Sequence, residues 1–395
     1  MRALLLLAVL AALAAAAPAA VAGAAPVVGI SDSNPIMFDD PSFAATRIST
    51  TRLMIAYDTV EAATRGDTEL DGRVVPYLAA AAAARVQPLV TFEHSRGSWT
   101  ECRAAPRLRQ CRLPGGTEYH DAVRAFLERF PQVTHVSPWN EANHPAQPTA
   151  RAPKMAARYA NIVAGVCREL RRRCTIVVAD VLDAADRADA RRLTFRRTTR
   201  WIRRFRAALK IPRRVCGIHN YSDVNRFRAD GTKALMRALG CREYWITESG
   251  GLFRFGQFWD EALRRTAGCR SRAACQLKAT RHLFAITGRM RRVKRIYVHS
   301  WYAGRRDRFD AGIVSGWRTD WMALPRPAFY VVRDHAWDGP VVRVPAPPGP
   351  PPPPEEPVFE WPPDALFEGL PDDQAPPIAD APPEPESEPA PAPAP

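Results

Sequence analysis

Two stretches of the sequence decide the fold, HVSPWNE (His135–Glu141) and YWITES (Tyr244–Ser249). Each is a short, mostly apolar run that ends in polar residues, and this pattern is typical of a buried parallel strand where it leaves the core. A glutamate stands at the end of both runs, Glu141 in the first and Glu248 in the second. Because an unpaired carboxylate is costly to remove from water, a glutamate in this position indicates a partner or a function.

Six similar runs accompany these two, and longer helical patterns separate them. The eight predicted strands are Val27–Ser31, Arg52–Tyr57, Pro88–His94, His135–Trp139, Thr175–Leu182, Val215–Tyr221, Tyr244–Ser249 and Arg295–Trp301. The predicted helices are Val74–Arg85, Glu118–Phe130, Lys154–Arg172, Thr198–Lys210, Lys233–Leu239 and Gln276–Met290, with a weak first unit at Asp39–Thr46 and a last segment near Pro325–Val332. This alternation predicts an α/β fold, the (β/α)8 or TIM barrel, whose reactive groups lie at the carboxyl ends of the strands. A doubly wound open sheet is the alternative, but the sequence has neither a G-x-G-x-x-G after an early strand nor a P-loop.

The two ends of the chain differ in composition from the part that carries the strands. Residues 1–24 hold an apolar, alanine-rich run followed by A-x-A sites, which predicts a signal peptide and a secreted, extracellular or cell-envelope protein. From Pro345 to Pro395, 21 of the 51 residues are proline and 11 are acidic, with no Lys or Arg. Such a segment buries too little apolar surface to offset its ordering entropy. We therefore expect a barrel domain at 25–343 and a disordered, Pro-rich acidic tail at 344–395, acting as a spacer or as a docking segment.

The body of the chain is strongly basic. Outside the tail, 30 acidic residues stand against 56 Lys and Arg, a net charge of +26, and 51 of those 56 are arginine. No nucleic-acid-binding motif and no basic strip with interleaved aromatic residues accompanies this charge, so we expect a solvated Arg-rich surface and no nucleic-acid partner. No segment after the signal peptide reaches 18 uninterrupted apolar residues, so no membrane span is expected there.

Eight cysteines, an even number, suit an exported protein with disulfides. Pairing of sequence neighbours gives Cys102–Cys111, Cys167–Cys174, Cys216–Cys241 and Cys269–Cys275, although eight cysteines allow 105 pairings. A zinc site is the alternative, but these spacings are wider than the usual C-x₂₋₄-C and no histidine stands at ligand spacing.

Glu141 and Glu248 end the fourth and seventh predicted strands, and these strand ends face each other across a barrel. Two carboxyl groups about 5–5.5 Å apart suit retaining glycoside hydrolysis, whereas inverting enzymes need about 6.5–9.5 Å. One group must stay protonated to act as an acid, and the other must stay ionised to act as a nucleophile. The strand-end position alone is a weak signal, because other acidic residues share it: Asp58, Glu93, Asp180, Asp183 and Asp223.

The residues around the two glutamates make the prediction of a catalytic pair more specific. Asn140-Glu141 closes the fourth strand and Glu248 the seventh, and in this the sequence resembles the clan A glycoside hydrolases of the family 5 and family 39 kind. Further matching positions are Arg52 at the start of the second strand, His94 at the end of the third, His219-Asn220-Tyr221 at the end of the sixth, Trp301 at the end of the eighth, and the late segments Asp310–Ile313 and Arg326–Ala328. The likeness covers roughly residues 27–332 through scattered motifs.

The resemblance implies a role for each matching residue. Glu141 would be the general acid/base and Glu248 the nucleophile. Asn140 would bind the sugar 2-hydroxyl, and Tyr221 would support Glu248. His94, His219 and Arg52 would support the carboxylates, and Trp301 would form the floor under the reacting sugar, with stacking also from Trp139 or Tyr302.

The sequence therefore predicts a secreted, monomeric retaining glycoside hydrolase that cleaves an oligo- or polysaccharide by double displacement, without cofactor or metal. A non-catalytic carbohydrate-binding or cell-wall-associated barrel is the alternative, and transglycosylation would use the same covalent intermediate. A metal held by His94, His144 and His219 with Glu93 lacks any H-E-x-x-H or similar ligand pair. A serine nucleophile lacks G-x-S-x-G.

Overall fold

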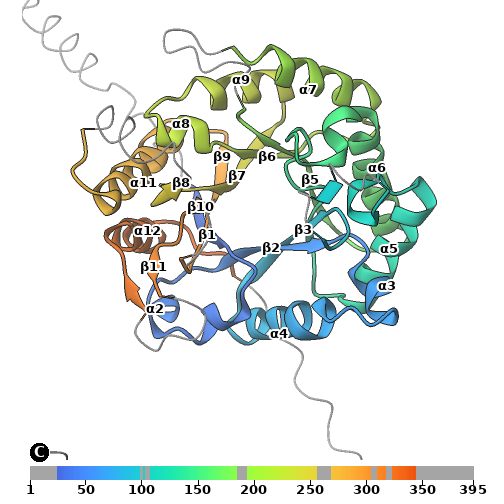
Figure 1. The fold of residues 1–395 in the computed structure, drawn as a ribbon, viewed down its shortest axis with the longest axis horizontal. Coiled ribbons are helices and arrows are strands. Elements are labelled where there is room, and N and C mark those ends of the chain that lie inside the picture. The colour runs from blue at the N-terminus through green and yellow to red at the C-terminus, as the bar shows by residue number, and fades with distance from the viewer. Residues whose placement is uncertain are drawn as a thin grey trace, which may run out of the picture. The chain divides into compact units, whose positions relative to one another are not determined.

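Eight parallel strands close into a barrel, and helices surround it (Figure 1). The computed structural model describes residues 25–343 except 98–100, 103–106, 185–193, 256–267, 304–308 and 317–322. Within these residues the barrel order is β1-β2-β3-β4-β5-β6-β7-β9, so each strand pairs with its successor and β9 closes on β1. The predicted (β/α)8 barrel is confirmed. The predicted signal peptide at 1–24 and tail at 344–395 lie outside the described residues.

The barrel strands agree closely with the sequence prediction. They are β1 (Val27–Ser31), β2 (Thr50–Ala56), β3 (Gln87–Glu93), β4 (His135–Ser137), β5 (Thr175–Leu182), β6 (Val215–His219), β7 (Glu243–Ser249) and β9 (Val293–Val298). Five strands end earlier than predicted, β2 and β3 by one residue and β4, β6 and β9 by two or three. Pro138, which has no N–H to donate, follows β4 directly, and a helix begins at Tyr221 just after β6. β9 ends at Val298, three residues before Trp301.

In the described part of the chain, ten α-helices accompany the barrel strands. They are α2 (Pro41–Ala44), α3 (Thr59–Thr64), α4 (Val75–Ala83), α5 (Gly116–Arg129), α6 (Pro153–Glu169), α7 (Arg196–Ala208), α8 (Tyr221–Asn225), α9 (Asp230–Leu239), α11 (Arg272–Gly288) and α12 (Pro327–Asp338). The short α3 and α8 were not predicted from the sequence. Two small antiparallel pairs, β8 (Arg254–Phe255) with β10 (Phe309–Asp310) and β11 (Val314–Ser315) with β12 (Leu324–Pro325), lie outside the barrel strands. Among the described helices, none has the length and apolar character needed to cross a membrane.

The interior of the barrel is apolar at one level and polar at the next. One apolar cluster consists of Leu89, Val177, Val215, Trp245 and Tyr297, contributed by five strands. Because side chains on a strand alternate between its faces, the residues two positions further along point into the barrel at a higher level. Thr91, Gly217 and Thr247 occupy those positions, and β5 adds Asp180 through a register shift between Val177 and Asp180. A polar layer therefore separates the apolar base from the carboxyl end of the barrel.

All four predicted disulfides are confirmed. Cys102–Cys111, Cys167–Cys174, Cys216–Cys241 and Cys269–Cys275 have Cα separations of 5.4, 6.1, 6.1 and 5.3 Å. Within the described part of the chain no cysteine is unpaired. Disulfides of this number are typical of proteins in oxidising compartments.

Gly217→Ala is expected to destabilise the barrel by about 1–3 kcal/mol, because a Cβ at Gly217 would overlap Asp180 and come within 2.7 Å of Thr247 Oγ1. Urea-induced unfolding followed by circular dichroism measures the loss. Gly288→Ala in α11 is the matched control, since nothing lies within 4 Å of its added Cβ, and it should be neutral or slightly stabilising. Equal stability of the two variants would contradict the tight packing of the polar layer.

Candidate active site

Arg52 on β2 lies at the centre of the polar layer and is 1% exposed. Its guanidinium uses all five N–H groups on acceptors from different parts of the barrel. The acceptors are Thr91 Oγ1 (3.0 Å), Ser31 Oγ (3.1 Å), Glu248 Oε2 (2.6 Å), Asn140 Oδ1 (2.7 Å) and Asp180 Oδ2 (3.1 Å). Burial alone would lower the pKa of Arg52, but the charges of Asp180 and Glu248 raise it. The group is therefore a fixed cation that holds one carboxylate of β5 and one of β7.

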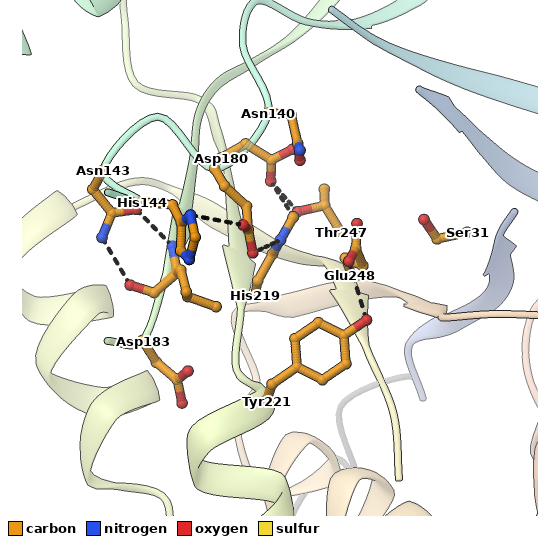
Figure 2. A network of polar contacts seen from close by, with 12 residues as sticks. Ser31, Asn140, Asn143, His144, Asp180, Asp183, His219, Tyr221, Thr247 and Glu248 are labelled. Carbon is orange, nitrogen blue, oxygen red and sulfur yellow. Dashed lines mark hydrogen bonds and ion pairs between the residues drawn. The ribbon is translucent and has the colours of Figure 1, made fainter. Parts of the chain in front are cut away.

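Glu248 lies near the end of β7 with its side chain 13% exposed. One oxygen accepts from Arg52, and the other accepts the O–H of Tyr221 at 3.1 Å (Figure 2). Burial raises the pKa of Glu248, but the charges of His299, His219 and Arg52 outweigh burial and lower it to about 2. Glu248 is therefore ionised near neutral pH, as a nucleophile must be.

Tyr221 is held in position by the start of α8. Asp183, which follows β5, accepts the backbone N–H groups of Ser222 (3.0 Å) and Asp223 (2.8 Å). These bonds fix the first turn of α8 and thereby the direction of the Tyr221 ring. Burial first, and then the charge of Glu248, raise the pKa of Tyr221 well above its ordinary value, so the phenol keeps the proton that it donates.

Glu141 lies in the turn after β4, with its side chain 19% exposed and a backbone φ of +39°. This left-handed conformation strains a residue that carries a Cβ, so the surrounding contacts must hold it. Asn143 supplies two of them, because its side chain donates to the carbonyl of Leu182 (2.9 Å) and accepts the Leu182 N–H (2.8 Å) on β5. The turn that presents Glu141 is therefore fixed to β5.

The two glutamates meet at the carboxyl end of the barrel. One carboxylate oxygen of Glu141, one of Glu248 and one ring nitrogen of His219 all lie within 4.8 Å of one another. This separation matches the roughly 5–5.5 Å of retaining glycosidases and is shorter than the roughly 6.5–9.5 Å of inverting ones.

His219, at the end of β6, is completely buried between two carboxyl groups. Its Nε2 lies 3.1 Å from Asp180 Oδ1 (Figure 2). Its Nδ1 lies 3.0 Å from Glu141 Oε1. Burial alone would lower the pKa of His219, but the charges of Asp180 and Glu248 raise it to about 10. Asp180 is 0% exposed, and His219 and Arg52 lower its pKa despite burial. These two residues therefore form a buried ion pair.

The structure brings most of the predicted site residues together. Arg52, His219 and Tyr221 contact one or both glutamates as the resemblance implied, and Asn140 joins the site through Arg52. The expected contact of Asn140 with a sugar hydroxyl stays a prediction. His94 contacts the carbonyl of Ser95 at 2.7 Å, and its role beside the two glutamates also stays a prediction.

The predicted role of Trp301 as an exposed floor under a sugar is wrong in this structure. The indole is 0% exposed, and Nε1 donates to Asp40 Oδ2 at 2.9 Å. Its ring packs edge-to-face on Phe43 at 5.3 Å and on Phe329 at 5.7 Å. Because β9 ends at Val298, Trp301 lies beyond the strand and enters the core between α2 and α12. Trp139 is likewise 2% exposed.

Two residues of the site were missed or not singled out by sequence reasoning. Asp180 lies near the end of a predicted strand, but four other acidic residues do so as well, and this position alone does not single it out. The bulge in β5 is what turns the Asp180 side chain into the barrel. His299 follows β9, and its Nδ1 lies 2.9 Å from the carbonyl oxygen of Ser31. It was not predicted as a site residue from the sequence. The alternation Arg295, Tyr297, His299 along the last strand is the signal that would have found it.

Glu141, His219 and Glu248 have the residue types of a small metal site. However, a metal ligand must be a neutral imidazole with a free lone pair, and the raised pKa of His219 keeps both nitrogens protonated between two carboxyl groups. The Arg52 guanidinium beside Glu248 further disfavours a cation. This donor set suits a proton network better than a metal.

Comparison with known proteins gives structural matches only. No protein-family model matches the chain, and no curated protein matches it in sequence. A family 1 β-glucosidase from Thermotoga maritima is similar, with a TM-score of 0.54 and 12% identity over 81% of this chain and 100% of that chain.

Two complexes of β-glucosidase from Thermotoga maritima are similar as well. The complex with noeuromycin has a TM-score of 0.51 and 12% identity over 80% of this chain and 98% of that chain. The complex with deoxynojirimycin has a TM-score of 0.51 and 13% identity over 78% and 87%. At this identity the likeness establishes a shared fold, which confirms the fold expected from the clan A resemblance. The narrower likeness to families 5 and 39 stays a prediction.

Arg52→Met is expected to lower the free energy of unfolding by about 3–5 kcal/mol, because it leaves the carboxylates of Asp180 and Glu248 without their cation. Denaturant unfolding measures the change. Arg124→Met is the control, since Arg124 pairs with Glu128 on the exposed face of α5 and a solvent-exposed pair of this kind contributes little to stability. Similar losses in both variants would contradict the central position of Arg52.

Acid should destabilise the protein partly through Glu248. Its pKa of about 2 in the folded state lies below the ordinary value of about 4.3, so its contribution to stability is present above pH 4–5 and is lost as the pH falls toward about 2. Unfolding free energies measured from pH 6 to pH 2 should fall less steeply in Glu248→Gln than in the wild type. Parallel curves would contradict the lowered pKa.

Proposed function

We propose that this protein is a retaining glycoside hydrolase in which Glu248 is the nucleophile and Glu141 is the general acid/base. The observation that supports this most directly is the approach of the two carboxyl groups to within 4.8 Å at the carboxyl end of a TIM barrel. Their environments also differ, because Glu248 accepts hydrogen bonds from Arg52 and Tyr221 while Glu141 lies beside the imidazoles of His219 and His144. Such a difference is what divides nucleophile from acid.

In the first step, a Glu248 oxygen attacks the anomeric carbon and the bond from that carbon to the leaving oxygen breaks. The proton of Glu141 passes to the leaving oxygen, so the product is a glycosyl ester on Glu248 and a carboxylate on Glu141. In the second step, Glu141 takes a proton from water, the water oxygen attacks the anomeric carbon, and the ester bond breaks. Glu248 is again a carboxylate and Glu141 is again protonated.

The contacts of Glu248 support its role in both steps. The O–H of Tyr221 and the guanidinium of Arg52 stabilise the carboxylate before attack and again as it leaves. Because Arg52 is held by acceptors on neighbouring strands, it keeps Glu248 in one orientation without reorganisation. This is the preorganisation that the chemistry requires.

The substrate class we propose is a β-linked oligo- or polysaccharide. The clan A resemblance favours this linkage, and the structural neighbours named above are β-glucosidases. The four disulfides support an oxidising compartment, and together with the signal-like residues 1–24 they support a secreted or cell-envelope enzyme. We propose that the enzyme acts as a monomer.

Glu141→Gln should lower kcat by about 10²–10⁴-fold on substrates with poor leaving groups, because general acid catalysis is lost, and Glu248→Gln should abolish most turnover. Hydrolysis of a panel of aryl and natural β-glycosides measures both. Glu243→Gln, on the same strand as Glu248 but at its opposite end, is the control and should keep its activity. Undiminished turnover in either test variant would refute these roles.

Trapping identifies the nucleophile directly. Incubation with a panel of 2-fluoro-glycosides, followed by peptide mass mapping, should place the label on the peptide that contains Glu248, because the fluorine slows hydrolysis of the glycosyl ester. The glycoside that labels fastest reports the preferred sugar. Label on another carboxylate would overturn the assignment, and oligosaccharide binding without label or cleavage would favour a non-catalytic barrel.

A further inference from the structure

We propose that Asp180, a residue that touches neither substrate nor nucleophile, keeps the proton on Glu141 by acting through His219. In the terms of the proposed function, on which this inference rests, Asp180 is a positioning residue for the acid/base. The three side chains form a chain of contacts across neighbouring strands. Asp180 Oδ1 lies 3.1 Å from His219 Nε2 (Figure 2). On the other side of the ring, His219 Nδ1 lies 3.0 Å from Glu141 Oε1.

Asp180 lies inside the barrel, and several neighbouring side chains hold it there. It is 0% exposed, it accepts from Arg52 at 3.1 Å and Ser137 at 3.3 Å, and it also accepts the hydroxyl of Thr247. Gly217 leaves the space that Asp180 fills, because any Cβ there would overlap it. The position and ionisation of Asp180 are therefore fixed before substrate binds.

The charges of the network sum to zero in both halves of the proposed cycle. Arg52 and His219 carry two positive charges, and Asp180 and Glu248 carry two negative ones, so the free enzyme is balanced when Glu141 is protonated. In the glycosyl intermediate Glu248 is a neutral ester, and balance then requires Glu141 to be a carboxylate. A buried network that stays neutral avoids the penalty of an uncompensated charge at either stage.

Without Asp180 this balance fails. Arg52 and His219 would then face only one anion in the free enzyme, and the excess positive charge would be relieved by loss of the proton from Glu141 or from His219. Loss of the Glu141 proton weakens the general acid near neutral pH. Asp180 thus supplies the second anion that makes a protonated Glu141 compatible with a protonated His219.

Four other titratable groups lie close to Arg52, Glu141 or Glu248. His144 Nδ1 lies 4.0 Å from Glu141 Oε2, and His299 faces Glu248 from the end of β9. Tyr221 keeps its proton, and burial raises the pKa of Glu93 beside Arg52, which favours the neutral acid. All four lie outside the chain of contacts that runs from Asp180 through His219 to Glu141.

The test is the titration of Glu141 in variants that change the network charge in opposite directions. Asp180→Asn removes an anion and should lower the pH at which Glu141 ionises by about one to two units, whereas His219→Gln removes a cation and should raise it by a similar amount. The double variant Asp180→Asn/His219→Gln restores neutrality and should return it close to the wild-type pH. Thr247→Val is the matched control, because it removes a hydrogen bond to Asp180 and no charge.

The readout is the ¹³C NMR signal of the glutamate side-chain carboxyl carbons in labelled full-length protein, assigned with Glu141→Gln. It does not depend on turnover. In parallel, the alkaline limb of kcat against pH on an aryl β-glycoside should move in the same directions as the titration. Circular dichroism verifies folding. If Asp180→Asn does not fold, a lower titration of Glu141 in Asp180→Asn/His219→Gln than in His219→Gln decides the question.

The two proposals fail in different ways. Titration shifts as expected without any glycoside hydrolysis would support the network and overturn the proposed function. Hydrolysis with an unchanged Glu141 titration in both single variants would overturn the role of Asp180 and leave the hydrolase assignment intact. Asp180→Asn and Thr247→Val could also lose the same amount of activity with no shift in the alkaline limb of kcat against pH. That result would show that Asp180 contributes to packing only.

Discussion

A single buried guanidinium organises the carboxyl end of this barrel. Arg52 has five N–H donors in a fixed planar arrangement, and each finds an acceptor on or beside a different strand of the barrel, from Ser31 on β1 to Glu248 on β7. A lysine would supply a flexible point charge in place of this planar fork. Besides the backbone pairing of the strands, Arg52 connects their inward side chains by hydrogen bonds, as the apolar cluster beneath it connects them by packing.

This arrangement explains why the barrel places polar residues where a hydrocarbon core would be more stable. Replacement of buried ion pairs by apolar residues is often neutral or stabilising in other proteins, so a buried pair is weak evidence for stability. What Arg52, Asp180 and His219 provide is fixed position and fixed charge next to the two glutamates. The apolar layer of Leu89 and Trp245 below them carries the packing, and the polar layer carries the electrostatics.

The sequence predicts those features that depend on local pattern. Strand alternation, strand-end glutamates and neighbouring cysteines gave the barrel, the site pair and the four disulfides, because each signal lies within a few residues of the chain. The directions of the Asp180 and Trp301 side chains depend instead on strand register and on where a strand ends. A bulge in β5 turns Asp180 inward, and the early end of β9 at Val298 sends Trp301 into the core. A shift of one residue in a strand reverses the side to which every later side chain points, and no sequence pattern here marks such a shift.

The strained turn at Glu141 links the polar layer to the chemistry. Its positive φ is held by Asn143, whose side chain pairs with Leu182 on β5, and the backbone N–H of Ala142 donates to the carbonyl of Asp180 on the same strand at 2.9 Å. The acid/base candidate and its buried anion are therefore positioned by one strand. Because β5 sets both the place of Glu141 and the charge that acts on it through His219, a displacement of β5 would alter orientation and protonation together. Few residues are needed to specify such a site, which is consistent with a shared fold at 12% identity.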